Sequence, residues 1–593
     1  MTRSLLLTGI GVSPGIAVGP IYVLGTELPE LTHRTISEDQ VKSEIARLHQ
    51  AIDTVRQQLT ELKARTRTLA GPEEAKIFAA QIAMLEDRDF LDDVERLVAE
   101  NQLTAERAFE FKVLEVRAIW AQSSSATLRQ RVADLLGIQI RVLRSLLGKT
   151  SDAVMHDKDA PPAIVLTKQL TAGLTVQLEK DHVIGLASER GTRTAHAAIL
   201  ARSLGIPCVM GLVGAKDDVV PGSMAILDGS LGTILIDPSE DQIRDARVRE
   251  GRRLEMTREL EAVLGKPSVT SDGTYISLRS NIDLPEEVEI AAEHGAEGVG
   301  LLRTEFLVVG RTELPGEDEQ ARFFEKVGRS FAPHPVVVRS YDLGGDKFPA
   351  TFNAEREANP FLGWRAIRVC LDEPDLFRTQ IRALLRARAS SDVRLMLPLV
   401  TDLREVERTR DLVEVATDEL RAEGVEFGED LPVGVMIETP AAAAMVDELA
   451  ELSDFLSVGT NDLTQYTLAV DRGNARLADR FNSLHPAIVR LLKQILDGGR
   501  RTGLDVSVCG EMASEPLPLF LLIGLGFRTV SGASASLPLV RWLIRRLDVK
   551  VAESAVQEVL RARHAREVTT ILERHIAGQV DLDLLEFGRL PTG

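Results

Sequence analysis

The sequence predicts a multidomain α/β protein that ends in a (β/α)₈ barrel of the TIM type. The chain has 593 residues, 44% of them hydrophobic, which is enough for several buried cores. Its second half alternates eight strand-like segments with helical segments, whereas residues 28–147 show helical patterns and no convincing strands. Between these two regions, a shorter stretch of mixed strands and helices predicts a small β/α domain.

The helical patterns of residues 28–147 indicate a helical bundle. Hydrophobic residues recur at alternating spacings of four and three, which is typical of a long helix packed along its length; they are Val41, Ile45, Leu48, Ile52, Val55, Leu59 and Leu62. Ser37 and Gln40 have the spacing of a capping box, so we expect this helix to begin there.

The stretch that begins at Ala163 predicts a compact α/β unit. Its β-like runs are AIVL, HVIGLAS and PCVMGL, and MAILDGSLGTILI is typical of a hairpin that turns at Asp228 and Gly229. Residues 244–261 are rich in charge, lack proline and contain a single glycine, Gly251, so we expect a solvated connecting helix there. A domain boundary is predicted at that helix.

The segments that follow the connecting helix predict the barrel. The strand candidates are YISLRS, GVGLL, VVVRSYDL, RLMLPL, VGVMI, FLSVG, VSVCG and RTVSG. Because the carboxyl ends of barrel strands meet at one face, polar side chains at those ends should converge. They are Arg303, Arg339, Asp342, Glu438, Asn461, Asp462 and Cys509. That face is the predicted site.

Two acidic strand ends predict a metal site. Asn461 and Asp462 follow one apolar strand within GTNDLTQYTLAVD, and Glu438 follows another, VGVMI. The Asn461-Asp462 pair alone would favour a polar turn. Carboxylates at two strand ends that are far apart in the sequence predict one shared hard cation.

Arg303, Arg339 and Arg472 predict an anion site beside that cation. Guanidinium groups bind phosphate and carboxylate through paired hydrogen bonds. A single arginine is more often a surface ion-pair partner, so the prediction depends on the three lying together. Arg365, in NPFLGWRAIR, is a weaker candidate, because a place within a helix explains it as well.

Cys509 and His196 are the candidate reactive side chains. A buried cysteine is usually a small hydrophobic residue, which describes Cys208 and Cys370, but at a barrel strand end a thiol with its ordinary pKa of about 8.5 can act as an acid. His196 lies where a loop enters a helix, with Gly205 as a candidate C-terminal cap. A helix N-terminus favours a neutral imidazole and a phosphoryl group attached to it, although most histidines there are caps or surface residues.

Charge and cysteine content exclude several classes of protein. The net charge of −19 argues against nucleic acid or an anionic membrane as a partner. Three dispersed cysteines are too few for a disulfide framework or a Cys-rich metal site. No window reaches the roughly 18 apolar residues of a membrane span, and the N-terminal apolar run is too short for a signal peptide. We therefore expect a cytoplasmic protein without membrane insertion.

A set of longer motifs carries a family resemblance over nearly the whole chain. They are SPGIAVG (13–19), GTRTAHAAILARSLGIP (191–207), GAEGVGLLRTEFL (295–307), LGGDK (343–347), NPFLGWRAIR (359–368), ETPAAA (438–443), GTNDLTQYTLAVDRGN (459–474) and CGEMA (509–513). Together they resemble phosphoenolpyruvate-protein phosphotransferase, enzyme I of the bacterial sugar phosphotransferase system. A chance match to all of these motifs in order is not credible.

The resemblance implies a phosphohistidine mechanism. His196 would accept the phosphoryl group of phosphoenolpyruvate, Cys509 would protonate the enolate, and Glu438 with Asp462 would hold Mg²⁺, with Mn²⁺ as an alternative. The substrate would be bound by Arg303, Arg339, Asn461, Asp462 and Arg472. The phosphohistidine would then pass its phosphoryl group to a histidine of the carrier protein HPr, the first step of sugar uptake.

The resemblance also implies a domain organisation. Residues 1–27 and 148–240 would form a swivelling β/α phosphohistidine domain, and the bundle of residues 28–147, inserted in it, would dock HPr. A linker helix would cover residues 241–265, and the barrel of residues 266–593 would form a homodimer. Because the chain begins directly with the SPGIA segment, it is similar to the carbohydrate branch rather than to the nitrogen branch, which carries an added N-terminal domain.

Two departures from the family pattern bear on these expectations. Thr192 replaces the usual second glycine before the active histidine, which would stiffen or reshape the loop but removes no catalytic group. The segment RVADLLGIQIRVL, around Leu135 and Gly137, lacks the acidic and basic residues that the family usually shows there, so the docking surface or the interdomain contacts would differ.

Two alternative functions are weighed against this assignment. A pyruvate phosphate dikinase or phosphoenolpyruvate synthase, similar in the histidine domain and barrel, needs a nucleotide-binding domain, and residues 28–147 indicate a helical bundle instead. A catalytically silent, phosphate-sensing regulator would have no need of the functional residues, all of which are present. The phosphotransferase is therefore the prediction.

Overall fold

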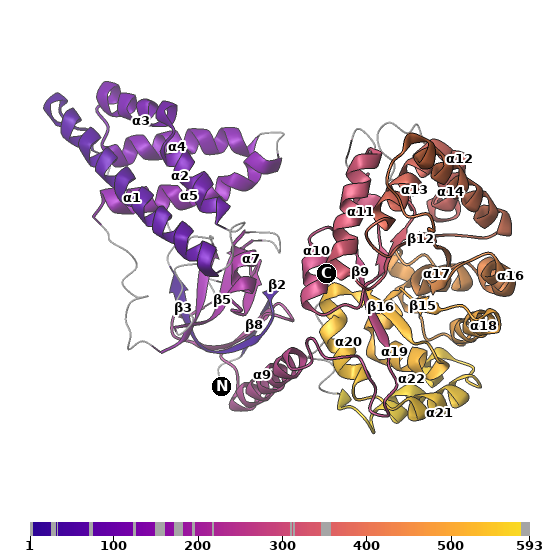
Figure 1. Ribbon diagram of the computed structural model, residues 1–593. Coiled ribbons are helices and arrows are strands. Elements are labelled where there is room, and N and C mark those ends of the chain that lie inside the picture. Colours follow the sequence, from indigo (N-terminus) through magenta and orange to yellow (C-terminus); the bar gives the residue numbers. More distant parts are fainter. Residues whose placement is uncertain are drawn as a thin grey trace. The chain divides into compact units, whose positions relative to one another are not determined.

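The protein, described by a computed structural model, divides into two compact units. The described residues are 4–24, 31, 34–69, 75–122, 126–148, 161–170, 182–191, 196–215, 219–308, 311, 315–344 and 357–582. One unit comprises Met1–Arg253 and the other Leu254–Gly593. Figure 1 labels the elements of both units. No helix in the described part of the chain is long and apolar enough to cross a membrane.

The first unit contains a mixed β-sheet. Its eight described strands are β1 (Leu5–Thr8), β2 (Ile10–Ser13), β3 (Ile16–Leu24), β4 (Ala163–Gln169), β5 (Val183–Arg190), β6 (Cys208–Met210), β7 (Met224–Asp228) and β8 (Thr233–Ile236), in the spatial order β1-β8-β7-β3-β4-β5-β6-β2. The predicted hairpin is confirmed, because β7 and β8 are antiparallel. Asp228 opens their turn by accepting hydrogen bonds from the backbone N–H groups of Ser230 and Leu231.

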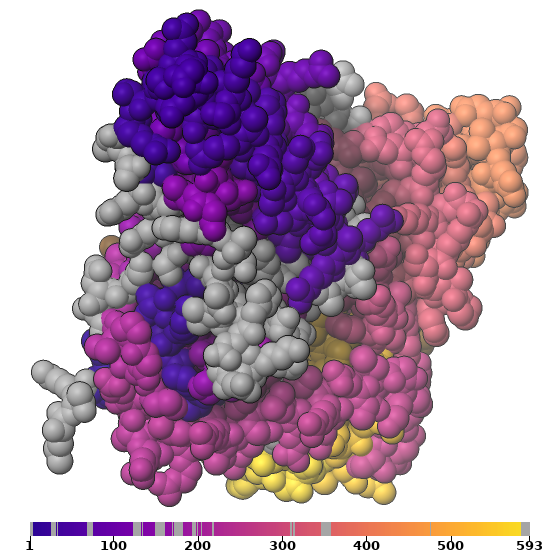
Figure 2. All heavy atoms as spheres, turned by 90° about the vertical axis from the view of Figure 1, so that its left-hand side faces the viewer, coloured from indigo at the N-terminus to yellow at the C-terminus, as the bar shows by residue number. Residues whose placement is uncertain are grey.

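A helical bundle with its own core lies between β3 and β4 in the sequence. Its helices among the described residues are α1 (Val41–Leu69), α2 (Lys76–Leu85), α3 (Arg88–Asn101), α4 (Ala105–Ala121) and α5 (Ala126–Leu146). Leu48, Val55 and Leu59 of the predicted α1 seam are fully buried in that core. The predicted capping box at Ser37 and Gln40 is present, but it opens a short 3-10 turn that leads into α1. Figure 2 shows the bundle as a continuous surface at the top of the view.

The second unit is built around a closed parallel barrel, which confirms the predicted (β/α)₈ architecture. Its described strands are β9 (Ser277–Ile282), β10 (Val299–Leu302), β11 (Val336–Arg339), β12 (Val393–Leu397), β13 (Val433–Ile437), β14 (Leu456–Val458), β15 (Val506–Val508) and β16 (Thr529–Ala533). Each strand pairs with the next, and β16 closes the ring on β9. The strands read as apolar runs because helices cover their outer face and side chains fill the interior.

Helices alternate with the barrel strands and surround them (Figure 1). They are α10 (Glu287–Glu293), α11 (Glu317–Phe331), α12 (Ile367–Asp372), α13 (Pro374–Arg388), α14 (Leu403–Glu423), α15 (Pro440–Ala444), α16 (Val446–Glu451), α17 (Thr460–Leu468), α18 (Pro486–Thr502), α19 (Pro516–Leu525), α20 (Leu537–Ile544), α21 (Val549–Val559) and α22 (Ala565–Ile576). Helix α18 shows why such segments are helical. His485 caps it, Pro486 is its first residue, and Gly503 ends it with a left-handed backbone at φ 77°.

The connecting helix α9 (Glu240–Glu261) contributes to the cores of both units. Ala246, in its first half, packs with Ile16 of the first unit. Met256, in its second half, lies in the core of the barrel unit and is 1% exposed. Most other positions of α9 are exposed, as its charge predicts. The predicted solvated connecting helix is therefore confirmed, with Ala246 and Met256 as its buried exceptions.

A barrel fragment that starts at Leu254 should be more stable than one that starts at Lys266. The longer fragment keeps Met256 and Val263, which are 1% and 7% exposed in the barrel core. Burial of one such side chain contributes roughly 1.5–3 kcal/mol, so losing both should lower the unfolding midpoint by at least about 4 °C. Thermal melts followed by circular dichroism would check this. Equal midpoints would show that α9 does not stabilise the barrel.

Candidate active site

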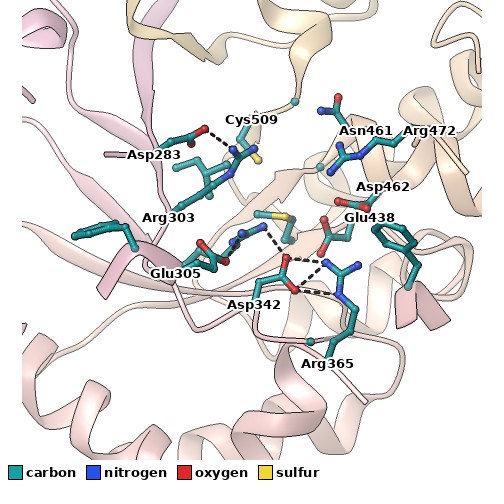
Figure 3. Close-up of a pocket in the computed structure, with 18 of the residues that line it drawn as sticks. Asp283, Arg303, Glu305, Asp342, Arg365, Glu438, Asn461, Asp462, Arg472 and Cys509 are labelled. Carbon is teal, nitrogen blue, oxygen red and sulfur yellow. Dashed lines mark hydrogen bonds and ion pairs between the residues drawn. The ribbon is translucent and has the colours of Figure 1, made fainter. Parts of the chain in front are cut away.

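The residues predicted at the barrel strand ends line one cavity. This cavity has a volume of about 730 Å³, and its lining includes Arg303, Arg339, Asp342, Glu438, Asn461, Asp462, Arg472 and Cys509. Arg472 comes from the segment after α17, and the others end a strand, follow one or begin the next helix. Figure 3 labels all of these side chains except Arg339 and shows the labelled ones around a common space. The structure thus brings together the barrel residues selected from the sequence, and their individual roles stay predictions.

The end of β13 fixes Glu438 in this cavity. All five residues of β13 are buried. Thr439 then caps α15 by accepting a hydrogen bond from the Ala442 N–H at 3.0 Å, and Pro440 is the first residue of that helix. The backbone N–H of Leu399 donates to Glu438 Oε1 at 2.6 Å. The carboxylate is therefore held at the strand end by the backbone of a neighbouring segment.

Glu438 and Asp462 form an acidic pair to which no arginine is bonded in the described part of the chain. Burial and the charges of Asp462 and Asp342 raise the pKa of Glu438 to about 8, and Arg339 opposes this shift. Asp462 Oδ1 is buried and has no hydrogen-bond partner among the described residues. A buried carboxylate oxygen without a partner costs free energy unless a cation accompanies it. The pair therefore fits a divalent cation.

Oxygen ligands of this kind suit Mg²⁺. In the described ranges, no cluster of three or more His, Cys, Asp or Glu side chains could by itself hold a metal ion. Mg²⁺ usually needs no such cluster, because it binds through one or two carboxylates together with water and substrate oxygens. Glu438 and Asp462 match that pattern, provided that a substrate supplies further oxygens.

Two arginines of the cavity, Arg339, which is buried, and Arg365, which is partly buried, are held in ion pairs. Arg339 is 6% exposed and pairs with Glu305 and with Asp342. Arg365 donates to both carboxylate oxygens of Asp342, at 2.8 and 2.7 Å. Burial alone would lower the pKa of Arg339, but Glu305, Asp342 and Glu438 together raise it. Both guanidinium groups therefore stay charged and are fixed in orientation.

Arg303 and Arg472 are the more accessible cations of the cavity. Arg303 pairs with Asp283, and these two side chains are 37% and 48% exposed. The guanidinium of Arg472 makes no hydrogen bond or ion pair with any described residue, although its backbone N–H donates to Gln465 Oε1 at 3.1 Å. An anion that enters from solvent would displace few existing contacts at these two groups.

Sequence reasoning missed two carboxylates of the cavity and underrated one arginine. Asp283 and Glu305 line the cavity and pair with Arg303 and Arg339, respectively. Glu305 lies two residues after Arg303 in LLRTEF, so its position after a strand was an available signal. Arg365 also lines the cavity, and it precedes α12 rather than lying within it. The helical explanation of Arg365 is therefore wrong.

The charges of the cavity do not balance. Its lining contains four arginines and five carboxylates, the latter being Asp283, Glu305, Asp342, Glu438 and Asp462. When all are ionised, one negative charge is in excess. A bound divalent cation would reverse the sign, so that the cavity would attract an anion.

Cys509 lines the cavity and also belongs to an apolar cluster. Its neighbours in a buried cluster inside the barrel are Leu301, Val337, Met396, Met436 and Phe455. Cys509 is 3% exposed, and burial raises the pKa of its thiol to about 11 against the opposing hydrogen bond of Ser457. The thiol is thus protonated at neutral pH and can supply a proton to a ligand in the cavity.

His196 is the first residue of helix α7 (His196–Ser203), in the first unit. Its side chain lies outside the described residues, as do Thr192 and residues 345–347 of the LGGDK segment. Leu200 of α7 is buried in the core of the helical bundle. The predicted cap is confirmed, because Gly205 has φ 64° and donates its N–H to the last turn of α7. The start and end of the helix therefore match the sequence prediction.

Comparisons with known proteins identify the class. Three family models match: "PEP-utilising enzyme, N-terminal" over residues 8–131, "PEP-utilising enzyme, mobile domain" over residues 159–232, and "PEP-utilising enzyme, PEP-binding domain" over residues 257–549. The barrel cavity lies in the region matched by the PEP-binding model. The chain thus has the parts of a PEP-utilising enzyme.

Whole-chain relatives identify the family. The chain is 36% identical over 573 residues to the phosphoenolpyruvate-protein phosphotransferase of Geobacillus stearothermophilus, covering 96% of this chain and 98% of that protein. It is 35% identical to the protein of that name from Listeria monocytogenes and 34% identical to that from Bacillus subtilis, in each case over 96% of this chain and 99% of the relative. The chain belongs to the phosphoenolpyruvate-protein phosphotransferase family, as its motifs predict.

The stability of the metal-free protein should fall as pH rises toward 8. The pKa of Glu438 is raised from its ordinary value of 4.5 to about 8 in the folded chain. Between these values the folded state binds more protons than the unfolded state, so the free energy of unfolding decreases with pH. Glu438→Gln removes this titration.

The unfolding temperature of Glu438→Gln should therefore decline less between about pH 5 and 8 than that of the unsubstituted chain. The difference should be at least about 2 °C, which roughly 1 kcal/mol produces in a domain of this size. Scanning calorimetry with a metal chelator present would measure both profiles. Parallel profiles would mean that the pKa of Glu438 is close to its ordinary value.

Proposed function

We propose that this chain transfers the phosphoryl group of phosphoenolpyruvate to His196 and then to a histidine of the carrier protein HPr, releasing pyruvate. This is the first step of sugar uptake by the phosphotransferase system, in the cytoplasm. One observation carries the proposal: a single cavity combines arginines that can bind an anion with two carboxylates that lack a cation. The names of the relatives support the same reaction.

The cavity offers groups for both anionic ends of phosphoenolpyruvate. Arg303, Arg339 and Arg472 would bind its phosphate and carboxylate through paired hydrogen bonds, and Asn461 would add an N–H donor. Arg339 Nε is buried and has no partner among the described residues. A buried donor of this kind is costly until a ligand bonds to it. The substrate would supply the missing acceptor.

Glu438 and Asp462 would hold Mg²⁺, or alternatively Mn²⁺. The bound metal would neutralise negative charge on the substrate and on the enolate that leaves. Because its raised pKa keeps Glu438 protonated near neutrality, this side chain would release its proton when it becomes a ligand. Metal affinity should therefore increase with pH.

The imidazole of His196 would attack phosphorus in line. A phosphorus–nitrogen bond forms while the bond to the bridging oxygen breaks, and the electron pair stays on the enolate. The N-terminus of α7 favours the phosphoryl group on His196. Cys509 then gives its thiol proton to the methylene carbon, which yields pyruvate. Solvent would return a proton to the thiolate.

The helical bundle would dock HPr. Phe111, Leu114 and Ile119 of α4 are exposed apolar side chains, which suit a protein partner. At the departure from the family pattern, Leu135 is buried in the core, whereas open space surrounds Gly137 where a side chain would begin. The departure therefore reaches both the bundle core, at Leu135 and Ile138, and the surface of α5, at Gly137.

The domain division is part of the same proposal. Residues 1–27 with 148–240 would form the phosphohistidine domain, residues 28–147 the docking bundle, residues 241–265 the linker, and residues 266–593 the barrel that dimerises. A dikinase or synthase is disfavoured, because it needs a nucleotide-binding domain where helices α1 to α5 pack around their own core.

His196→Ala should abolish phosphoryl acceptance without weakening substrate binding. The acceptor nitrogen is lost, whereas the proposed substrate groups belong to the other compact unit. Incubation with labelled phosphoenolpyruvate and Mg²⁺ should reduce incorporation at least about 100-fold, with affinity by calorimetry changed less than about twofold. His49→Ala, in the bundle, is the matched control. A stable, acid-labile phosphoryl group on His196→Ala would identify another acceptor.

Cys509→Ala should slow pyruvate formation much more than it weakens substrate binding. The charged groups of the cavity remain, but the enolate has no positioned acid, and such acids contribute about 10²- to 10⁴-fold. A coupled assay for pyruvate and calorimetry for phosphoenolpyruvate would separate the effects. Cys370→Ala, also buried but outside the cavity lining, is the control. Preserved turnover at saturation would assign Cys509 to packing.

A further inference from the structure

Asn461 and Glu511 hold each other through a reciprocal pair of hydrogen bonds. The backbone N–H of Glu511 donates to Asn461 Oδ1 at 3.1 Å, and Asn461 Nδ2 donates to Glu511 Oε1 at 2.9 Å. A backbone N–H can only donate, and a carboxylate can only accept. Both contacts therefore require the same orientation of the Asn461 amide, and turning the amide by half a rotation would break both of them.

Gly510 allows this contact by bringing two segments close together. A Cβ atom at position 510 would lie 1.8 Å from Thr460 Oγ1 and 2.7 Å from the Thr460 nitrogen. Only glycine lets the turn after β15 approach the first turn of α17 this closely. The same turn directly follows Cys509, so the candidate acid and the partner of Asn461 belong to one short segment.

The reciprocal pair decides what Asn461 can offer to a ligand. Asn461 lines the cavity. Its oxygen is turned toward Glu511, and one of its two N–H groups is bonded to the Glu511 carboxylate. The second N–H group is the donor that remains for the cavity. Asn461 is thus suited to donate a hydrogen bond to an anion. Asp462 is then the residue of α17 that could bind the metal.

We propose that Glu511 is a positioning residue that keeps the Asn461 amide oriented as a donor toward the phosphate of phosphoenolpyruvate. The proposal rests on the proposed function, in which Asn461 binds that substrate. The positioning role predicts the opposite effect of removing Glu511 from the one that charge alone predicts. An exposed carboxylate beside an anion site repels the anion, so its loss should strengthen binding if charge alone mattered. If orientation matters more, its loss weakens binding.

The test compares Glu511→Ala with Glu511→Gln in the full-length chain. Both carry His196→Ala, so that calorimetry with phosphoenolpyruvate and Mg²⁺ measures binding without turnover. Glu511→Ala keeps the backbone N–H that donates to Asn461 Oδ1 but removes the carboxylate that accepts from Asn461 Nδ2, so it should weaken binding by up to about tenfold, as expected for one hydrogen bond to a charged group. Glu511→Gln keeps an acceptor without the charge, so its affinity should stay within about twofold or increase. Glu451→Ala is a control for removing an exposed carboxylate elsewhere on the barrel unit.

A double variant tests whether Glu511 acts through Asn461. In an Asn461→Ala background, adding Glu511→Ala should change affinity by less than about twofold, because the amide to be oriented is gone. Tighter binding by Glu511→Ala, or additive losses in the double variant, would overturn the positioning role alone. If Asn461→Ala itself leaves affinity unchanged, Asn461 does not bind the substrate, and that part of the proposed function fails together with this inference.

Discussion

Charge compensation in the barrel mouth is the constraint on which the rest of the site depends. Arg339 is buried and tolerated there because Glu305 and Asp342 pair with it. Glu438 and Asp462 have no such cationic partner in the described chain, and one oxygen of Asp462 is left without any hydrogen bond. In the proposed function, this acidic pair would bind a small cation, and the arginines of the cavity would bind an anion.

Ion pairs orient two arginines of the site. A buried ion pair contributes little net stability, because desolvation offsets most of the attraction, but it fixes geometry. Asp342 bonds Arg365 through both of its oxygens and also contacts Arg339. Two cations are therefore oriented by one carboxylate before any substrate arrives. Preorganised charges of this kind need no rearrangement during the reaction, which is where electrostatic catalysis gains most.

Most of the fold could be predicted from the alternation of strand and helix patterns in the sequence. Much of the site could be predicted because its residues lie at strand ends. Once strands such as VGVMI close into a parallel barrel, Glu438 and Asp462 must share one mouth, however far apart they are in the chain. The contact of Arg365 with Asp342 could not be predicted, because it depends on how the segment before α12 folds back. The reciprocal bonds of Asn461 and Glu511 depend likewise on a close approach between two turns. Spacing in the sequence does not encode such approaches.

Protonation of Glu438 relates the charge of the cavity to the binding of a metal ion and of an anion. With its pKa raised to about 8, this carboxyl is largely neutral at pH 7 in the metal-free chain. Exchange of that proton for a divalent cation would add one positive charge to the cavity. An anionic substrate would then be attracted only after the metal is in place. In the proposed function, burial of Glu438 would thus couple substrate binding to metal binding, and the buried Oδ1 of Asp462, which has no hydrogen-bond partner among the described residues, would be a second ligand of the same cation.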